Sequence, residues 1–154
     1  MEGRRQMTRL LKFFNKHVPG LEHAYAASVQ NGIGIRETRR IRGVYELSGE
    51  DVLQGRQFPD AIAHNGYCID IHDPSGKKWG ARFIQSERSA YDIPYRCLVP
   101  LTLDGLLVAG RCISASHDAQ GSIRIMPACM ATGEAAGTAA ALAVRSGCQP
   151  RAVD

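Results

Sequence analysis

The sequence has no long run of charge of one sign; acidic and basic residues are mixed along it. Its 154 residues contain 19 Lys and Arg against 15 Asp and Glu, which gives a net charge of +4. Proteins that bind nucleic acid carry a basic patch or stripe. The composition therefore argues against nucleic acid as a partner. At 44% hydrophobic residues, the chain has enough apolar surface for the core of one ordinary domain.

Long apolar runs are also missing. Residues 126–144 have roughly the length of a membrane span, but they are mostly Ala and Gly with Glu134 near the middle, which is too weakly apolar to insert. Gly133 and Gly137 instead predict a helix that lies close against a sheet or a cofactor. The first residues lead into an amphipathic segment rather than a secretory signal. We expect a cytoplasmic location and no membrane contact.

Cysteine pairs of the Cys-x-x-Cys type are absent. The five cysteines are odd in number and widely spaced, which argues against a disulfide scaffold and against a zinc or iron–sulfur motif. Free thiols fit a reducing cytoplasm. The histidines His64, His72 and His117 have no ligand spacing. We therefore expect no metal site.

Hydrophobic periodicity predicts three helices. An amphipathic helix is expected over 2–17, a short helix over 50–54 after Ser48, and a long Ala-rich helix over 126–145 that ends before Gly147. Segments rich in Ile, Val, Thr and Tyr predict strands. These segments are 33–47, 61–71, 78–84 and 106–109, with a turn at 73–76. Residues 91–98 are also expected to be extended, but Pro94 and Pro100 suit an edge strand or a loop. The predicted fold class is α+β or mixed α/β.

The run Leu-Leu-Val-Ala at 106–109 predicts a strand covered on both faces. Such a strand needs neighbours in a parallel sheet, and this sequence barely supplies them. We therefore expect the chain to be the carboxyl part of something larger.

Several motifs in a fixed order resemble FAD-dependent oxidoreductases. They are Gly-Ile-Arg-Glu-Thr-Arg-Arg-Ile at 34–41, Tyr-Asp-Ile-Pro-Tyr-Arg at 91–96, Leu-Val-Ala-Gly-Arg-Cys-Ile-Ser-Ala-Ser-His at 107–117, Gly-Ser-Ile-Arg-Ile-Met-Pro at 121–127 and Gly-Glu-Ala-Ala-Gly at 133–137. The resemblance extends from Met7 to Ala143 and implies FAD as the cofactor. After the amphipathic helix, placed over 1–20, it implies two further parts: a β-rich substrate-domain segment over 21–100, and the last strand, loop and helix of the FAD-binding domain over 101–154.

The phosphate-binding turn usual in this family is missing. Such enzymes open with a strand, a Gly-x-Gly-x-x-Gly turn and a helix, whereas residues 32–37 place Glu37 where the third glycine belongs. The FAD site of this chain is therefore expected to be incomplete. A truncated gene product, an incompletely defined gene, or a split protein whose other chain supplies the dinucleotide-binding half would each explain this. Some relatives resemble the flavin subunit of heterodisulfide reductases and carry a 4Fe–4S cluster, which the cysteine spacing here does not support.

The expected cofactor-binding residues surround the start of the last helix. Gly110 is the position where a side chain would collide with a cofactor across the strand end, and Arg111 can reach a phosphate or ribityl oxygen. Backbone N–H groups at the helix start can face the flavin, which adds Ser122, Arg124, Ile125 and Met126. Alternatively, Gly110 is only a turn, Ser122 only a cap, and Arg124 the partner of a surface acid.

Three side chains are candidates for catalysis. Arg124 can stabilise the negative charge of a reduced flavin. His117, in the loop expected before the last helix, can exchange a proton near neutral pH. His72 lies beside Asp70 and Asp73 in the sequence and can form a His/Asp pair that faces the substrate. Otherwise both histidines are inert loop or strand-end residues.

Two further groups of residues can each be interpreted in two ways. The charged residues Arg36, Glu37, Arg39 and Arg40 either bind an anionic substrate or form an ion-pair ladder across strands. Tyr95 and Arg96 either line the substrate pocket or belong to a packed loop. By the resemblance, the chain transfers a hydride between a small organic substrate and flavin. The alternative is a non-catalytic remnant or partner domain that does not hold FAD alone.

Overall fold

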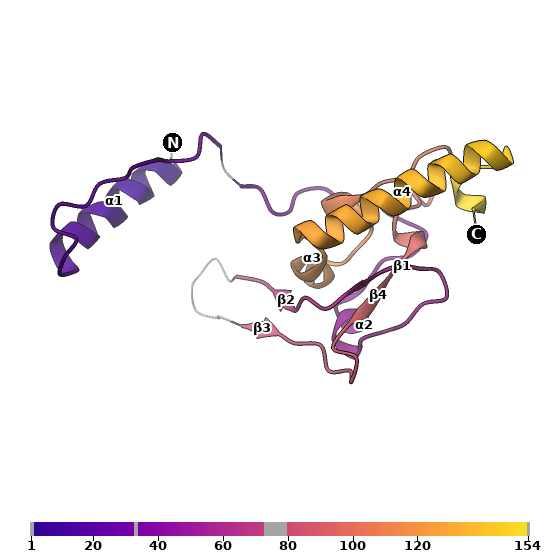
Figure 1. Cartoon of the computed structure of the whole chain (residues 1–154), viewed down its shortest axis with the longest axis horizontal. Coiled ribbons are helices and arrows are strands. Elements are labelled where there is room, and N and C mark those ends of the chain that lie inside the picture. Colours follow the sequence, from indigo (N-terminus) through magenta and orange to yellow (C-terminus); the bar gives the residue numbers. More distant parts are fainter. Residues whose placement is uncertain (1, 33, 73–79, 154) are drawn as a thin grey trace. The chain divides into compact units, whose positions relative to one another are not determined.

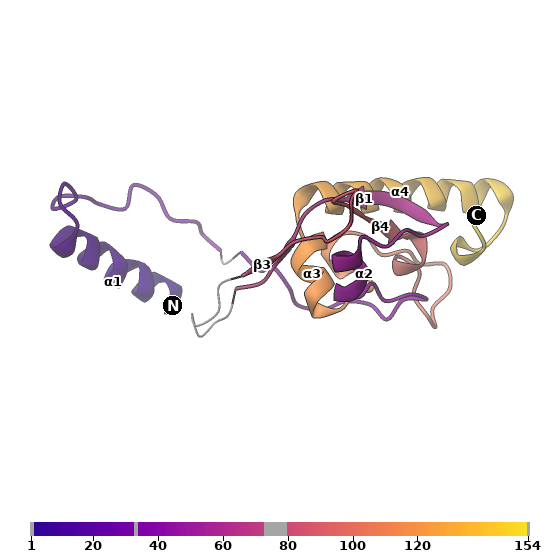
Figure 2. The same cartoon turned by 90° about the horizontal axis from the view of Figure 1, so that it is seen from below.

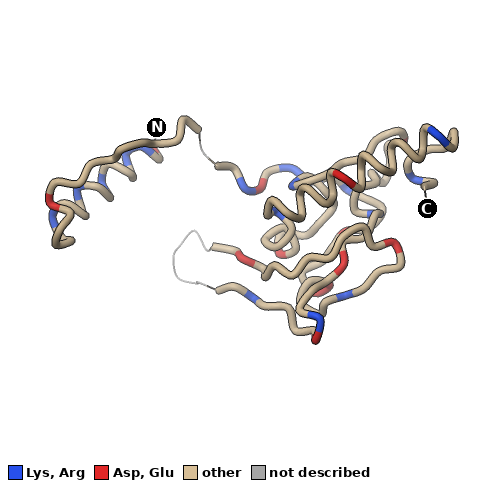
Figure 3. Tube along the Cα trace, in the orientation of Figure 1, with Lys and Arg blue, Asp and Glu red and all other residues tan. Residues whose placement is uncertain are grey.

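The structure is a computed structural model that describes residues 2–32, 34–72 and 80–153. The chain folds as two compact units, residues 1–35 and 36–154. Figures 1 and 2 show the helices and strands of each unit. Figure 3 shows mostly basic residues along α1 and residues of both signs along the second unit. Within the described ranges, no helix is long and apolar enough to cross a membrane.

The first unit contains the helix α1, Glu2–His17, which confirms the predicted amphipathic helix. The Asn15 side chain donates hydrogen bonds of 3.0 Å to the carbonyls of Glu22 and Ala24. These bonds tie the following segment back along the helix. Leu10 and Phe13 of α1 are more than half exposed.

The second unit combines helices with two small antiparallel sheets, which confirms the mixed α+β class. The helices are α2 (Gly49–Gln54), α3 (His117–Ile123) and α4 (Met126–Ser146). The strands are β1 (Ala61–Asn65), β2 (Ile69–Asp70), β3 (Ala81–Arg82) and β4 (Tyr91–Pro94). Short 3-10 turns cover Tyr95–Cys97, Gly110–Cys112 and Pro150–Ala152.

The antiparallel pair β1–β4 is the centre of the second unit. Its register sets His64 opposite Asp92 and Asn65 opposite Tyr91. β4 is buried along its whole length, because α4 packs against β1 and α2 packs against β4 (Figure 1). The core contains the aromatic side chains of Phe58 and Tyr91 and the buried aliphatic side chains of Leu47, Val52, Ile69, Ile93, Leu98, Ile113 and Ile123.

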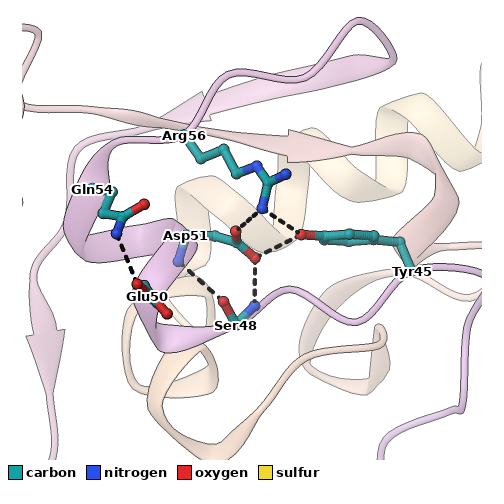
Figure 4. A network of polar contacts seen from close by, with 6 residues as sticks. All are labelled: Tyr45, Ser48, Glu50, Asp51, Gln54 and Arg56. Carbon is teal, nitrogen blue, oxygen red and sulfur yellow. Dashed lines mark hydrogen bonds and ion pairs between the residues drawn. The ribbon is translucent and has the colours of Figure 1, made fainter.

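Ser48 caps α2, as the sequence predicts. Its hydroxyl accepts a bond from the Asp51 N–H, and the Asp51 carboxylate accepts one from the Ser48 N–H. The Tyr45 hydroxyl and Arg56 also donate to Asp51, over 2.8 and 2.9 Å (Figure 4). Burial works against the charged form of Asp51, but the bonds from Ser48 and Arg56 outweigh it and lower the pKa of this carboxyl.

Two predicted strands are wrong. The described part of 33–47 forms no strand and has only isolated bridges, Gly43 with Pro100 and Leu47 with Ala115. Residues 106–109 form no strand, although the Val108 N–H donates to the Leu98 carbonyl. β-branched and apolar residues favour extended backbone, but a strand exists only where a neighbouring segment completes its hydrogen bonds.

The predicted hairpin is confirmed in part. β2 pairs with β3, Ile69 opposite Arg82 and Asp70 opposite Ala81. The strand predicted over 61–71 is divided into β1 and β2, and β1 pairs with β4 instead. The turn predicted at 73–76 lies outside the described residues.

The predicted last helix is confirmed as α4, which ends at Gly147 in the left-handed conformation. The close packing predicted through Gly133 and Gly137 is wrong, because both are exposed and a Cβ on either would meet nothing within 4 Å among the described residues. The structure adds α3, where the sequence predicts a loop. Ser116 caps α3 by accepting a bond from the Ala119 N–H. α3 lies directly against β2, because a Cβ on Gly121 would come within 2.8 Å of Ile71 Cγ1. Glycine permits this approach.

Candidate functional site

Gly110 begins a turn beside the first turns of α4. Its φ of +70° lies in the left-handed region that favours glycine. Its N–H donates to Thr132 Oγ1 over 3.0 Å, and Thr132 in turn donates to the Ala128 carbonyl. The structure therefore holds the predicted cofactor-binding Gly110 against the same helix whose start is predicted to face the flavin.

No side chain caps the start of α4. Ile125 is the N-cap residue, and Pro127 occupies one of the first two helical positions. Met126 is 79% exposed. The first helical bond runs from the Cys129 N–H to the Ile125 carbonyl. A helix start without a side-chain acceptor suits a carbonyl oxygen or an anion, because its free N–H groups and dipole favour negative charge.

Gln120 supports the turn at Gly110 from inside α3. Its Nε2 donates to the Arg111 carbonyl over 3.0 Å. The Gln120 side chain is fully buried, and its Oε1 has no hydrogen-bond partner among the described residues. A buried oxygen without a donor is costly. The turn predicted to contact the cofactor therefore has an unsatisfied acceptor close to it.

Asp70 brings two predicted catalytic residues together. Arg124 follows α3, and its Nη2 donates to the Asp70 carbonyl over 2.9 Å and to the Asp70 carboxylate over 3.3 Å. His72 Nε2 lies 3.3 Å from the other carboxylate oxygen of Asp70. The Arg124 side chain is only 15% exposed. The predicted partner Asp73 lies outside the described residues.

Ser122 belongs to a buried polar network behind this cluster. Its hydroxyl donates to the Tyr67 carbonyl over 2.6 Å and contacts the Tyr91 hydroxyl at 2.7 Å. Asn65 donates to the Tyr91 hydroxyl. Burial raises the pKa of Tyr91 to about 12, so this phenol stays protonated. The Ser122 side chain is committed to the interior of the fold and does not cap α4.

His117 stands at the opposite end of α3 from Arg124. It is the first residue of this seven-residue helix, which is about 10 Å long, rather than part of a loop. Its Nδ1 lies 2.8 Å from Glu37 Oε2, although the two residues are 80 positions apart. Arg40 pairs with the other Glu37 oxygen. The structure thus separates His117 from the Arg124–Asp70–His72 cluster.

Two cavities flank these residues. One of about 470 Å³ is lined by His117 with Ser48, Glu50, Arg82, Ser116 and Asp118. The other, about 890 Å³, runs along the side of α4 from Ala131 onward and is lined in part by Tyr95 and Arg96. Arg96 is bound through two nitrogens to Asp60, and the Tyr95 hydroxyl donates to the Pro150 carbonyl. The larger cavity does not reach the start of α4.

The comparisons with known proteins identify the family. The sequence matches the FAD dependent oxidoreductase family over residues 1–154. The chain belongs to this family. No curated protein and no solved structure matches it. FAD is the cofactor of the family, and the predicted resemblance is confirmed.

The residues of this FAD-dependent oxidoreductase fit a flavin at the start of α4. The left-handed Gly110 permits close approach of the backbone, and the uncapped helix start offers free N–H donors. In the part of the chain that the structure describes, no three His, Cys, Asp or Glu side chains are grouped to hold a metal ion.

Sequence reasoning missed Thr132 and Gln120, which bind the turn at Gly110 and belong to no catalytic pattern. It named Asp70 as a partner of His72 and Glu37 as a member of a charged group, and the structure shows both pairings, His72 with Asp70 and Arg40 with Glu37. It did not predict that Asp70 also binds Arg124 or that Glu37 contacts His117. One available signal was Ser116 before an acidic residue, which marks a helix start and would have predicted α3.

Proposed function

We propose that this chain is the carboxyl-terminal part of an FAD-dependent oxidoreductase that transfers a hydride between a small organic substrate and flavin. One observation carries the proposal: Thr132 holds the left-handed Gly110 against α4, next to a helix start without a side-chain cap. When bound, FAD supplies the redox chemistry, and the protein supplies orientation and charge.

Each predicted site residue then has a role. The backbone at Gly110, Ile125 and Met126 holds the flavin, and Arg111 binds a phosphate or ribityl oxygen. The Ser122 hydroxyl does not bind the flavin, because it donates to the Tyr67 carbonyl. Ser122 contributes to the site only as a residue of α3. Arg124, oriented by Asp70, has further N–H donors for the negative charge of the reduced cofactor. His117 or His72 exchanges a proton with the substrate.

We further propose that a separate chain supplies the dinucleotide-binding half. The two sheets formed by the described residues are two-stranded and antiparallel, unlike the parallel sheet that holds a pyrophosphate. The exposed side of α4 supports this partner. Met126, Met130 and Val144 are each more than 70% exposed, and a Cβ on Gly133 or Gly137 would meet nothing within 4 Å.

A second candidate function is a non-catalytic remnant that does not hold FAD alone. The same antiparallel sheets favour it, because they provide no strand–turn–helix unit for the pyrophosphate among the described residues.

Titration of FAD with the purified chain tests the proposal. We expect quenching of flavin fluorescence and a flavin spectrum that survives gel filtration. The variant Gly110→Ala should weaken FAD binding at least tenfold, because the backbone leaves the left-handed conformation or is strained in it. Gly147→Ala is the matched control: its φ is +62°, at the far end of the same helix, so it carries the same strain without affecting FAD. Wild-type protein that leaves FAD fluorescence unchanged would contradict the proposal and favour the remnant.

A further inference from the structure

Glu37 is an unexpected partner for His117. The Glu37 side chain is only 26% exposed, and Arg40 binds the carboxylate oxygen that His117 does not. A carboxylate paired with a guanidinium is stabilised in its charged form. The pair therefore presents a fixed acceptor to His117 Nδ1 at 2.8 Å.

The Glu37 bond determines which ring nitrogen of His117 is available. A carboxylate accepts only, so neutral His117 carries its hydrogen on Nδ1 and keeps the lone pair on Nε2. The His117 side chain is 63% exposed and lines the cavity of about 470 Å³. A proton acceptor thus stands at the wall of a cavity of substrate size.

The other polar groups of this cavity indicate what it binds. Arg82 is paired with Asp118, and Glu50 accepts a bond from Gln54. The arginine of the described cavity lining is therefore already neutralised. The Ser48 and Ser116 hydroxyls accept helix N–H groups at 3.1 and 3.2 Å and keep their own hydrogens to donate. Hydroxyl donors and an imidazole base fit an uncharged hydroxylated molecule better than an anion.

We propose that Glu37, held by Arg40, positions His117 as the proton acceptor for the hydroxyl group of an uncharged, hydroxylated substrate in this cavity. This inference rests on the proposed function. His117 Nε2 takes the hydroxyl proton. When bound, FAD would supply the redox chemistry by accepting the hydride, with its two electrons, from the carbon that bears this hydroxyl group, so that the C–O bond becomes C=O. Glu37 is a positioning residue, because it acts through His117.

Nitrogen-15 NMR of the His117 ring tests the positioning without FAD. In the wild type we expect a protonated Nδ1 and an unprotonated Nε2 in the neutral ring. Glu37→Ala should let both tautomers populate. His64, which contacts Asp92 through Nδ1 at 2.6 Å, is the internal control and should not change. A wild-type ring with hydrogen on Nε2, or a ring unaffected by the substitution, would overturn the inference. The wild-type measurement decides even if the variant does not fold.

Ligand titrations test the substrate class on the same signals. Millimolar glucose, an uncharged polyhydroxyl compound, should shift the His117 ring resonances, whereas succinate, a dianion without hydroxyl groups, should not. A shift with succinate alone, or with neither probe, would contradict the substrate class. These outcomes are separable from the proposed function, since failure of FAD binding leaves the tautomer and the glucose shift intact.

Discussion

Gly121 is a residue near the site whose replacement should be poorly tolerated. An added Cβ would come 2.8 Å from Ile71 Cγ1 and 3.4 Å from the Asp70 carbonyl oxygen, so α3 and β2 must move apart. We expect Gly121→Ala to lower the free energy of unfolding by about 1–3 kcal/mol, the usual cost of overpacking. Urea denaturation of the purified protein measures the change.

Gly133 provides the control for Gly121. It lies inside α4, and a Cβ there would meet nothing within 4 Å. Gly133→Ala should raise the free energy of unfolding by roughly 0.5–1 kcal/mol, because alanine loses less entropy in a helix. Equal effects of the two substitutions would show that α3 does not approach β2 as closely as the structure has it.

Sequence motifs could point to single residues but not to their partners. The resemblance drew attention to Gly110, His117 and Arg124 because their motifs stand in the expected order. The bond between His117 and Glu37 spans 80 positions, and the one between Gly110 and Thr132 spans 22. No local spacing encodes such pairs, since they arise only when distant segments pack together.

Thr132 connects α4 to the turn at Gly110. Its hydroxyl accepts the Gly110 N–H and donates to the Ala128 carbonyl. Thr132→Val keeps the shape but leaves that N–H without an acceptor, which should cost about 1–3 kcal/mol of stability. The same variant should weaken FAD binding. Calorimetric melting and FAD titration measure the two effects.

Thr138 is the matched control on the same helix. Thr138 is exposed, so Thr138→Val also removes a threonine hydroxyl, but at a position where water can hydrogen-bond to the neighbouring groups. We expect nearly unchanged melting and FAD affinity. If the two valine variants behaved alike, the Gly110–Thr132 bond would not be the link between turn and helix.

Long helices, in which a residue pattern repeats over several turns, could be predicted from the sequence, and short elements could not. α1 and α4 repeat their apolar or small residues over several turns, which indicates both type and bounds. α3 has seven residues and packs through Gly121, too few for a period. Residues 33–47 and 106–109 have strand composition, but no neighbouring segment completes a ladder of hydrogen bonds with their described part.

The whole molecule should lose stability in acid. Burial works against the charged form of Asp92, but the Phe58 N–H, His64 and Arg88 outweigh it and lower the pKa of this carboxyl. The pKa values of Asp51 and Asp60 are also lowered. A folded-state pKa below the unfolded value of about 3.9 stabilises the fold above roughly pH 4. That stability is lost as the pH falls through the lowered pKa.

Asp92→Asn separates this effect from general acid sensitivity. We expect the variant to be less stable than the wild type at neutral pH, with a difference that shrinks as the solution becomes acidic. Asp104, whose side chain is 64% exposed, serves as the control, and Asp104→Asn should follow the wild-type curve. A constant difference between Asp92→Asn and wild type across the acid range would contradict the linkage.

The family of the molecule could be predicted, but the arrangement of its site could not. The ordered motifs were enough to indicate an FAD-dependent oxidoreductase, which the match over residues 1–154 confirms. They did not indicate that His117 and Arg124 stand at opposite ends of α3. Motif spacing measures distance along the chain. The site depends on how α3 packs against β2 and leads into α4, which the spacing does not give.

Mapping FAD onto the backbone amides by NMR tests the central claim most directly. If the start of α4 and the Gly110 turn hold the flavin, the amide signals of Gly110, Met126 and Ala128 will shift as FAD is added, while those of α1 stay in place. Shifts elsewhere in the chain, or no shift with saturating FAD, would contradict the account.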